Sequence, residues 1–315
     1  MALAIGVDIG GTKVAAGVVD ESGTVLALVR RPTPSDDVQA TEATIAEVVA
    51  ELSARYDVVA VGIGAAGWIA SDRATVLFSP HLAWRNEPLR DALAGRIGFP
   101  VTVENDANAA AWAEYRYGAG RGERVVLCVT LGTGIGGGLV VSGVLYRGAH
   151  GVACEWGHMS VVPDGRRCAC GNRGCWETYA SGTALARDAR ELAEVSPVAA
   201  HRLLQLVDGD PAALTGTHVL LAAGEGDPAA VEIFTTTGRW LGRGIADLAA
   251  IIDPSVVVVG GGVSEAGELL LGPAREAFAT SLTGRGFRPA APIRLAALGP
   301  DAGLVGAADL ARRRV

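Results

Sequence analysis

Three cysteines and a histidine lie close together in the middle of the sequence. Cys168, Cys170 and Cys175 fall within eight residues, and His158 lies ten positions before the first of them. Three thiolates and one imidazole are the ligands of a closed structural zinc site. Because four protein ligands leave no open position, we expect the ion to hold its neighbours in place and to do no chemistry itself. Unliganded thiols are the alternative.

Two glutamates flank this cluster. Glu155 lies three positions before His158, and Glu177 lies two positions after Cys175. A zinc ion would therefore fix both carboxylates in space. His158 has two ring nitrogens, so one can bind the metal while the other meets a hydroxyl group of a ligand.

Two glycine-rich segments are candidates for phosphate binding. "DIGGTK" begins at Asp8 and lacks the full spacing of a P-loop, whereas "GTGIGG" begins at Gly132 and matches the dinucleotide pattern but leads into a strand-like run. A glycine turn still lets backbone amides approach an anion, because no Cβ intervenes. In the first turn Thr12 adds a hydroxyl and Lys13 a positive charge. A purely structural tight turn is the alternative, but a carboxylate such as Asp8 beside phosphates suits Mg²⁺, directly or through water.

The two glycine segments share one layout of strand, glycine turn, strand and polar turn. The copies begin at Val7 and Val129. A duplicated fold with one such hairpin in each half explains this layout, and chance similarity of glycine-rich hairpins is the alternative.

A further acidic candidate occurs in "VTVENDANAAAWAEY". Asn105 and Asp106 lie where a strand turns into an alanine-rich helix. Judged on this segment alone, Asp106 is more simply a helix N-cap. A carboxylate at the end of a strand in an α/β sheet is also well placed to accept a proton from a hydroxyl group.

Composition and element order indicate a globular α/β protein of two domains. The chain has 315 residues, 50% of them hydrophobic, and 43 glycines. Strand-like runs such as "LAIGVDI", "VVAVGI", "RVVLCVTL" and "SVVVVGGG" alternate with helical patterns, and continuous apolar runs are typical of buried parallel strands. Predicted helices cover residues 38–55, 108–117, 182–193, 228–252, 264–280 and 303–314.

Charge and hydropathy exclude several classes of partner. The formal net charge is −7, and the only run of basic residues is the short tail 312–314, so we expect no nucleic-acid partner. We find no apolar stretch long enough to span a bilayer and no signal peptide, so we expect a cytoplasmic protein without a membrane partner. Five cysteines in a reducing compartment favour a metal site over disulfides.

Five motifs together resemble those of the ROK family (repressors, open reading frames and kinases), and within it the bacterial ATP-dependent glucokinases. "DIGGTK" and "LGTGIGGG" resemble the two phosphate motifs, "END" the catalytic segment, "EWGH" with "CACGNRGCWE" the sugar and zinc signature, and "VVVVGGGVS" the adenosine loop. They follow the family's order from about Val7 to Ser264. Cys154 departs from the pattern, because the family usually has glycine before the glutamate of "EWGH".

The resemblance implies a phosphoryl transfer from MgATP to the 6-hydroxyl of glucose, giving glucose 6-phosphate and ADP. Asp106 would be the general base, and Asp8 would hold Mg²⁺. The other implied roles are sugar binding by Asn105, Glu155, His158, Glu177 and Gly67, phosphate binding by Gly10, Gly11, Thr12, Lys13, Thr133 and Gly134, and nucleoside binding by Gly260, Gly261 and Gly262.

The resemblance also implies the two-lobed actin-like ATPase (ribonuclease H-like) α/β fold. We expect a smaller lobe of residues 1–107 plus 301–315 and a larger lobe of residues 108–300 that carries the zinc loop. Relatives of this kind are commonly dimers or tetramers, so a homodimer or homotetramer is expected. The repressor branch carries an N-terminal helix-turn-helix, and none fits before Val7, so we expect no DNA binding.

Three alternatives to an ATP-dependent glucokinase stay open. The first is a kinase for another sugar, namely mannose, N-acetylmannosamine, allose or fructose. The second is a kinase that uses polyphosphate as the phosphoryl donor. In the third, the chain is a sugar sensor without catalytic activity. The presence of Asp106 and of both glycine motifs favours a kinase over a sensor.

Overall fold

The computed structural model describes residues 2–313 of the chain, so Met1, Arg314 and Val315 of the predicted smaller lobe lie outside the described residues. It divides into two compact units. Unit 1 contains residues 1–127, 138–154 and 296–315, and unit 2 contains residues 128–137 and 155–295.

Unit 1 is built on a mixed five-stranded sheet with the strand order β3-β2-β1-β4-β8. β1 pairs in parallel with β4 and antiparallel with β2, and β4 pairs in parallel with β8. The strands are β1 (Leu3–Ile9), β2 (Lys13–Val19), β3 (Val25–Pro32), β4 (Val58–Ala65) and β8 (Val101–Asn105). All but β3 are mostly apolar and buried, as expected for strands covered on both faces.

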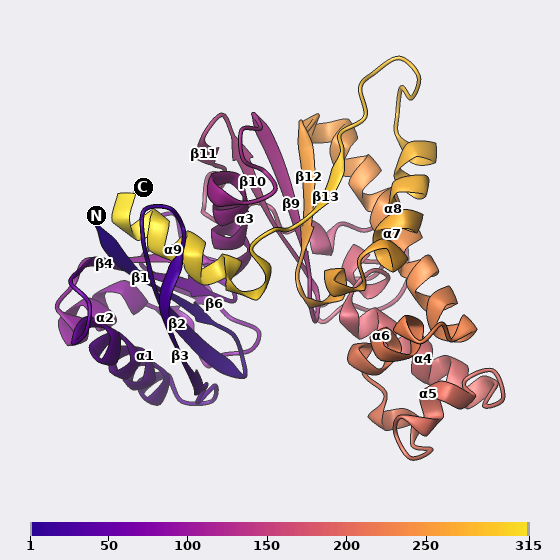
Figure 1. Ribbon diagram of the computed structural model, residues 1–315, viewed down its shortest axis with the longest axis horizontal. Coiled ribbons are helices and arrows are strands. Elements are labelled where there is room, and N and C mark those ends of the chain that lie inside the picture. The colour runs from indigo at the N-terminus through magenta and orange to yellow at the C-terminus, as the bar shows by residue number, and fades with distance from the viewer. Residues whose placement is uncertain (1, 314–315) are drawn as a thin grey trace. The chain divides into compact units, whose positions relative to one another are not determined.

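Helices cover both faces of this sheet. Figure 1 shows α1 (Val38–Ser53) and α2 (Leu89–Ile97) on one side and α9 (Ala302–Arg313) on the other. α3 (Asp106–Tyr117) follows β8 directly and packs against α9. Side chains of α1 and α2 complete the larger apolar core of unit 1, and those of α3 and α9 complete a smaller one.

Unit 1 also contains a small antiparallel sheet and the ends of the chain's second large sheet. The small sheet has the order β5-β6-β7. These shorter elements are β5 (Trp68–Ile69), β6 (Val76–Phe78), β7 (Arg85–Glu87), β11 (Val144–Leu145) and the 3₁₀ turn η5 (Gly299–Asp301).

Glycines allow α9 to approach the first sheet very closely. A Cβ atom on Gly6 of β1 or on Gly62 of β4 would lie only 1.8 or 1.9 Å from a backbone oxygen of α9. On the α3 side, a Cβ on Gly306 would lie 1.7 Å from a backbone oxygen of α3. These contacts leave no room for any side chain, so the position of α9 depends on the three glycines.

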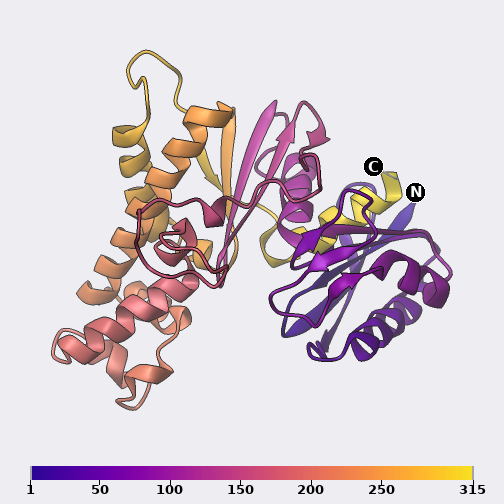
Figure 2. The same ribbon diagram turned by 180° about the vertical axis from the view of Figure 1, so that it is seen from behind.

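Unit 2 combines part of the second sheet with a group of helices. Its long helices α7 (Pro228–Ile252) and α8 (Glu268–Ser281) lie side by side in both views (Figures 1 and 2). α7 begins where expected, because Asp227 caps it and Pro228 occupies its first turn. The other elements of unit 2 are η1 (Trp156–His158), η2 (Trp176–Thr178), α4 (Gly182–Val195), α5 (His201–Gln205), η3 (Pro211–Ala213), α6 (Gly216–Gly224), β12 (Val256–Gly260), η4 (Gly262–Ala266) and β13 (Ile293–Leu295).

The second sheet repeats the strand order of the first. Its order is β11-β10-β9-β12-β13. If the strands of each sheet are numbered along the chain, both sheets have the order 3-2-1-4-5. β9 (Val125–Leu131) and β10 (Ile135–Val141) each contain a boundary between the two units. The prediction of a duplicated strand, glycine turn and strand unit agrees with this topology.

The compact units differ from the lobes expected from the sequence. Residues 108–127 and 138–154 were assigned to the larger lobe but are part of unit 1, and residues 296–300 belong to unit 1 as well. The reason is packing, because α3 lies against α9 and the Trp112 indole of α3 donates a hydrogen bond of 2.9 Å to Asp309 of α9. The predicted lobe boundaries stay a prediction about how the chain divides in solution.

Within residues 2–313, none of the helices is both long and apolar enough to span a bilayer.

The carboxylate of Asp309 is the main polar link between α9 and α3. It is 1% exposed and accepts hydrogen bonds from Tyr117 (2.6 Å), Trp112 (2.9 Å) and Arg312 (2.6 Å), with Arg116 at 3.2 Å. Burial alone raises the pKa of this carboxyl group, but the hydrogen bonds and the arginine charges outweigh burial and lower the pKa from 3.8 to about 2.

Asp309→Ala is therefore expected to lower the free energy of unfolding by about 3 kcal/mol at neutral pH, because it leaves buried donors without a partner. The folded-state pKa of Asp309 lies below its unfolded value, so this contribution is fully present above about pH 4 and is lost as the pH falls through about 2. Urea unfolding at a series of pH values measures it. Equal stability of variant and wild type at neutral pH would contradict the assignment.

Candidate active site

The β8–α3 turn of unit 1 carries Asn105 and Asp106. The side-chain oxygen of Asn105 accepts a hydrogen bond of 2.9 Å from the Asn108 amide and is thus the N-cap of α3. Asp106 is the first residue of the helix, and its carboxylate accepts a hydrogen bond of 2.9 Å from the Ala107 amide. The simpler interpretation of Asp106 as the N-cap is therefore wrong. The neighbouring asparagine performs that function and leaves the Asp106 side chain available.

Asn105 also links this turn to Gly67. Its Nδ2 donates a hydrogen bond of 3.0 Å to the Gly67 carbonyl, which follows the end of β4. Gly67 has a φ of 140°, and a Cβ there would lie 2.3 Å from the carbonyl oxygen of Phe78, so the position requires glycine. Two residues expected to bind sugar therefore lie in direct contact.

Asp106 and Asp8 are both carboxyl groups whose pKa is raised, and the charge of Asp106 acts on Asp8. Burial raises the pKa of Asp106 above its ordinary value of 3.8, against the effect of backbone amides and of the charge of His81. Burial, followed by the charge of Asp106, raises the pKa of Asp8 to about 7, while Lys13 lowers it. A nearby cation would compensate this concentration of negative charge.

The first glycine turn connects β1 and β2 beside these carboxylates. The Gly10 amide donates a hydrogen bond of 3.1 Å to the Lys13 carbonyl, which closes the turn and leaves the Thr12 and Lys13 side chains exposed. A Cβ on Gly11 would lie 2.9 Å from the Cβ of His81. The turn therefore exposes backbone, a hydroxyl and an ammonium group in the same unit as Asp8 and Asp106.

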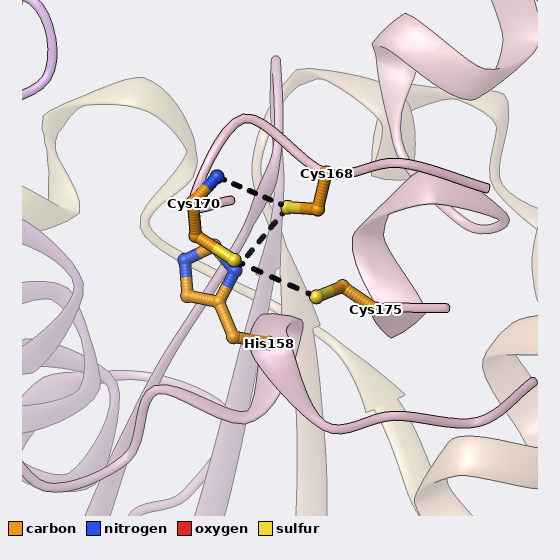
Figure 3. A group of neighbouring side chains, drawn as sticks. All are labelled: His158, Cys168, Cys170 and Cys175. Atoms are coloured by element: carbon orange, nitrogen blue, oxygen red, sulfur yellow. Dashed lines mark hydrogen bonds between the residues drawn. The ribbon is translucent and has the colours of Figure 1, made fainter. Parts of the chain in front are cut away.

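In unit 2, His158, Cys168, Cys170 and Cys175 converge (Figure 3). Their ligand atoms all lie within 4.8 Å of one another. His158 Nδ1 is 3.7 Å from the Cys168 sulfur, and the sulfurs of Cys170 and Cys175 are 3.6 Å apart. A tetrahedral zinc ion separates its ligand atoms by about 3.5–3.8 Å, so the set fits zinc in donor type and in spacing.

The two glutamates beside this cluster face His158 from different sides. Glu155 Oε2 lies 3.9 Å from His158 Nε2, and Glu177 Oε1 lies 3.6 Å from His158 Nδ1. Glu177 Oε1 also accepts a hydrogen bond of 2.9 Å from the Cys168 thiol. Nδ1 is therefore directed at the cysteines and Nε2 at Glu155.

The second glycine turn lies against Glu177 and against the start of α4. A Cβ on Gly134 would lie 2.4 Å from Glu177 Oε2. The Thr183 hydroxyl and amide donate hydrogen bonds of 2.7 and 3.3 Å to the Thr133 carbonyl, and the Gly182 amide donates one of 2.8 Å to the Gly132 carbonyl. The helix N-terminus is thereby fixed to the turn.

The loop after β12 packs on the same turn. Gly261 has a φ of 84°, and a Cβ there would lie 2.4 Å from the Leu131 carbonyl oxygen at the end of β9. The Ser264 hydroxyl donates a hydrogen bond of 2.7 Å to the Gly261 carbonyl. Gly260 is buried, whereas Gly261 and Gly262 are exposed.

The predicted residues thus form one group in each unit. The structure brings together Asp8, Gly10, Gly11, Thr12, Lys13, Gly67, Asn105 and Asp106 within unit 1. Within unit 2 it brings together Thr133, Gly134, Glu155, His158, Cys168, Cys170, Cys175, Glu177, Gly260, Gly261 and Gly262.

Sequence reasoning missed three neighbours of these groups. His81 lies on the loop after β6, next to Gly11. Asp301 belongs to η5, and its charge raises the pKa of Asp8. Thr183 lies at the start of α4. "SGT" before an apolar periodic segment was a detectable capping signal for the last of them. No local pattern marked His81 or Asp301.

The chain matches the ROK family over residues 4–314. It is 52% identical to a glucokinase of Streptomyces coelicolor over 312 residues, which cover 99% of this chain and 98% of that protein. It is 39% identical to a glucokinase of Thermotoga maritima, with 99% and 98% covered.

A solved structure of a ROK family glucokinase from Streptomyces griseus, in complex with glucose and AMPPNP, is also similar. The sequence identity is 54%, the TM-score is 0.92, and the match covers 99% of this chain and 100% of that one. The predicted fold class, the two-lobed actin-like ATPase fold, is thereby confirmed. The prediction from the five motifs is confirmed as well: this chain belongs to the ROK family.

Proposed function

We propose that this protein is a glucokinase that transfers the γ-phosphoryl group of ATP to the 6-hydroxyl of glucose. The observation that carries the proposal is the match over nearly the whole chain to relatives named glucokinase, one of them solved with glucose and AMPPNP. The geometry of unit 1 supports it, because a carboxyl group with a raised pKa follows the end of a parallel strand next to a glycine turn.

Asp106 is the general base in this proposal. Its carboxylate accepts the proton of the glucose 6-hydroxyl as the oxygen forms a bond to the γ-phosphorus, and the bond to the ADP oxygen breaks. A base works best when its pKa approaches the working pH, and burial moves the pKa of Asp106 in that direction.

The phosphates of ATP are bound by the two glycine turns in this proposal. Thr12 and Lys13, with the amides of Gly10 and Gly11, serve the first turn, and Thr133 and Gly134 serve the second. The loop Gly260–Gly262 binds the nucleoside. Asp8 fits Mg²⁺, since its burial beside Asp106 leaves negative charge that a cation would neutralise. When bound with ATP, Mg²⁺ reduces the charge of the phosphates.

Glucose is bound by hydrogen bonds to its other hydroxyl groups. In this proposal Glu155, His158 and Glu177 supply carboxylates and an imidazole, and Asn105 and Gly67 supply further polar groups. His158 and the three cysteines would hold zinc, which would fix the His158 ring with its Nε2 directed away from the cysteines. Sugar hydroxyl groups are discriminated strongly by such fixed polar partners.

A panel of assays tests this function against its alternatives. Formation of ADP is coupled to a spectroscopic readout with glucose, mannose, N-acetylmannosamine, allose and fructose, and glucose 6-phosphate formation is followed with polyphosphate as donor. We expect the highest kcat/KM with glucose and ATP. A higher value for another hexose or for polyphosphate rejects the proposed substrates, and glucose binding without turnover identifies a sensor.

Asp106→Ala is expected to lower kcat by about 10² to 10⁴-fold, the range for loss of a positioned general base, while glucose binding is partly retained. Asp37→Ala is the matched control, because Asp37 is a carboxylate at the start of another helix of unit 1, where it caps α1. The control should keep its kcat. Near-wild-type kcat in Asp106→Ala would show that the carboxylate is not the base.

Cys170→Ser is expected to weaken glucose binding strongly and to leave ATP affinity nearly unchanged, because loss of zinc releases His158 and Glu177. Elemental analysis should give one zinc per wild-type chain and much less in the variant. Cys128→Ser, which changes a cysteine of β9 outside the cluster, should keep its zinc. A zinc-free wild type with full activity would contradict this role, as would equal loss of glucose and ATP binding.

We also propose a homodimer or homotetramer, which light scattering at micromolar concentration measures. A cytoplasmic location stays a prediction.

A further inference from the structure

A buried carboxylate lies two positions before the proposed base. Glu104, the residue preceding Asn105 in β8, is 1% exposed. Its Oε2 lies 2.9 Å from Arg147 Nε and 3.2 Å from Arg73 Nε. Both arginine side chains are themselves largely buried, with 10% and 18% exposed. Glu104 is therefore the centre of a desolvated network of two cations and one anion.

The other oxygen of Glu104 holds the β8–α3 turn from both sides of Asp106. Oε1 accepts a hydrogen bond of 3.0 Å from the Asn105 amide, one of 3.2 Å from Asn108 Nδ2 and one of 3.1 Å from Arg147 Nε. Asn108 lies on the first turn of α3 and is 2% exposed. One carboxylate thus fixes the residue before Asp106 and a residue two positions after it.

Arg147 connects this carboxylate to the segment that follows Gly67. Its guanidinium donates hydrogen bonds to the backbone carbonyls of Ile69 (3.3 Å), Ala70 (2.9 Å) and Ser71 (3.2 Å). The Gly67 carbonyl accepts a hydrogen bond from the Asn105 side chain. The start of this segment, at Gly67, and its continuation at residues 69–71 are therefore linked to the β8–α3 turn by separate contacts.

Arg73 strengthens the same connection through its backbone. Its carbonyl accepts a hydrogen bond of 3.2 Å from the Val103 amide in β8, while its side chain pairs with Glu104. Arg73 has a φ of 53°, an uncommon value for a residue with a side chain.

Such a network contributes little net free energy to the stability of a fold. Replacing a buried ion triad by apolar residues is often neutral or stabilising, because the charges no longer have to be desolvated. The triad instead fixes the orientation of the groups bonded to it, since a carboxylate and a guanidinium each form several hydrogen bonds in fixed geometry. Here the bonds to Glu104 come from Asn105 and Asn108, on either side of Asp106, and those of Arg147 end on the segment after Gly67.

We propose that Glu104 and Arg147 are positioning residues for the phosphoryl transfer, which hold the Asn105–Asp106 turn in the orientation that the reaction requires. This inference rests on the proposed function. Neither residue touches a reacting atom in this role; both act through Asn105 and Asp106. A misplacement of about 1 Å lowers rates by about 10²-fold, so a small change in the turn is enough to be measured.

Glu104→Gln tests the role with little change of shape. The glutamine oxygen can still accept from Asn105, Asn108 and Arg147 Nε, but the variant loses the negative charge and places an amide group where Oε2 faces Arg147 and Arg73. We expect kcat to fall by about 10²-fold. The KM for ATP should stay within about threefold, since neither glycine turn belongs to the network.

Glu42→Gln is the matched control. Glu42 of α1 is also 1% exposed in unit 1 and also pairs with an arginine, Arg96, at 3.1 Å. Both glutamine variants should lower the melting temperature, and each is assayed well below its own transition. If the role of Glu104 is merely structural, the two variants will have the same kcat.

Arg147→Lys provides an independent variant, because it keeps the charge but cannot form all the hydrogen bonds of the guanidinium. We expect a smaller fall in kcat, about 10-fold, again without a change in the KM for ATP. Wild-type kcat in a folded Glu104→Gln or Arg147→Lys variant would overturn the proposal. So would an equal loss in Glu42→Gln, or a failure of both network variants to fold. Wild-type activity on glucose is measured first, and its absence would reject the proposed function and not the positioning role.

Discussion

The β8–α3 turn holds Asp106, the proposed base, where water does not fully stabilise its charge. The turn consists of the last residue of a parallel strand and the first residue of a helix. Asn105 caps the helix, so Asp106 does not have to. Burial then raises the pKa of Asp106. The rest of unit 1 can be understood by what it does for this turn.

Two features keep the turn in place. α9 packs on β1 and β4 through glycines, and Asp309 ties α9 to α3, the helix that begins at Asp106. The same packing brings the first turn of α9 to Asp8, where a Cβ on Gly303 would lie 3.1 Å from the carboxyl carbon. In unit 2, His158 and Glu177 lie in 3₁₀ turns of three residues and not in a long helix or strand. Contacts with the Cys168 sulfur help to fix the positions of both side chains.

Much of this arrangement could be predicted from the sequence. A continuous apolar run predicted β1 at its observed bounds, and a helical pattern predicted α7 over residues 228–252. Cysteine spacing predicted the His158 cluster. The small sheet β5-β6-β7 was not predicted, because strands of two or three residues have no periodicity to detect. β13 was missed for the same lack of length, and the short helices α2, α5 and α6 were not predicted either.

The contacts around the proposed base were less accessible to sequence reasoning. Asn105 and Asp106 are equally good caps by residue type, and the choice between them depends on the contact of Asn105 with Gly67, 38 positions away. Glu104 and Arg147 are separated by 43 positions and have no shared local pattern. Such pairs are determined by the fold as a whole.

The pH dependence of kcat/KM for glucose tests the central claim most directly, because it reports the ionisation of groups in the free enzyme. If Asp106 is the base, activity falls as the pH drops through a pKa above the ordinary 3.8 of an aspartate. The residual rate of an Asp106→Ala variant should lack that acidic limb, which also separates Asp106 from Asp8. An acidic limb that persists unchanged in the variant would contradict the account.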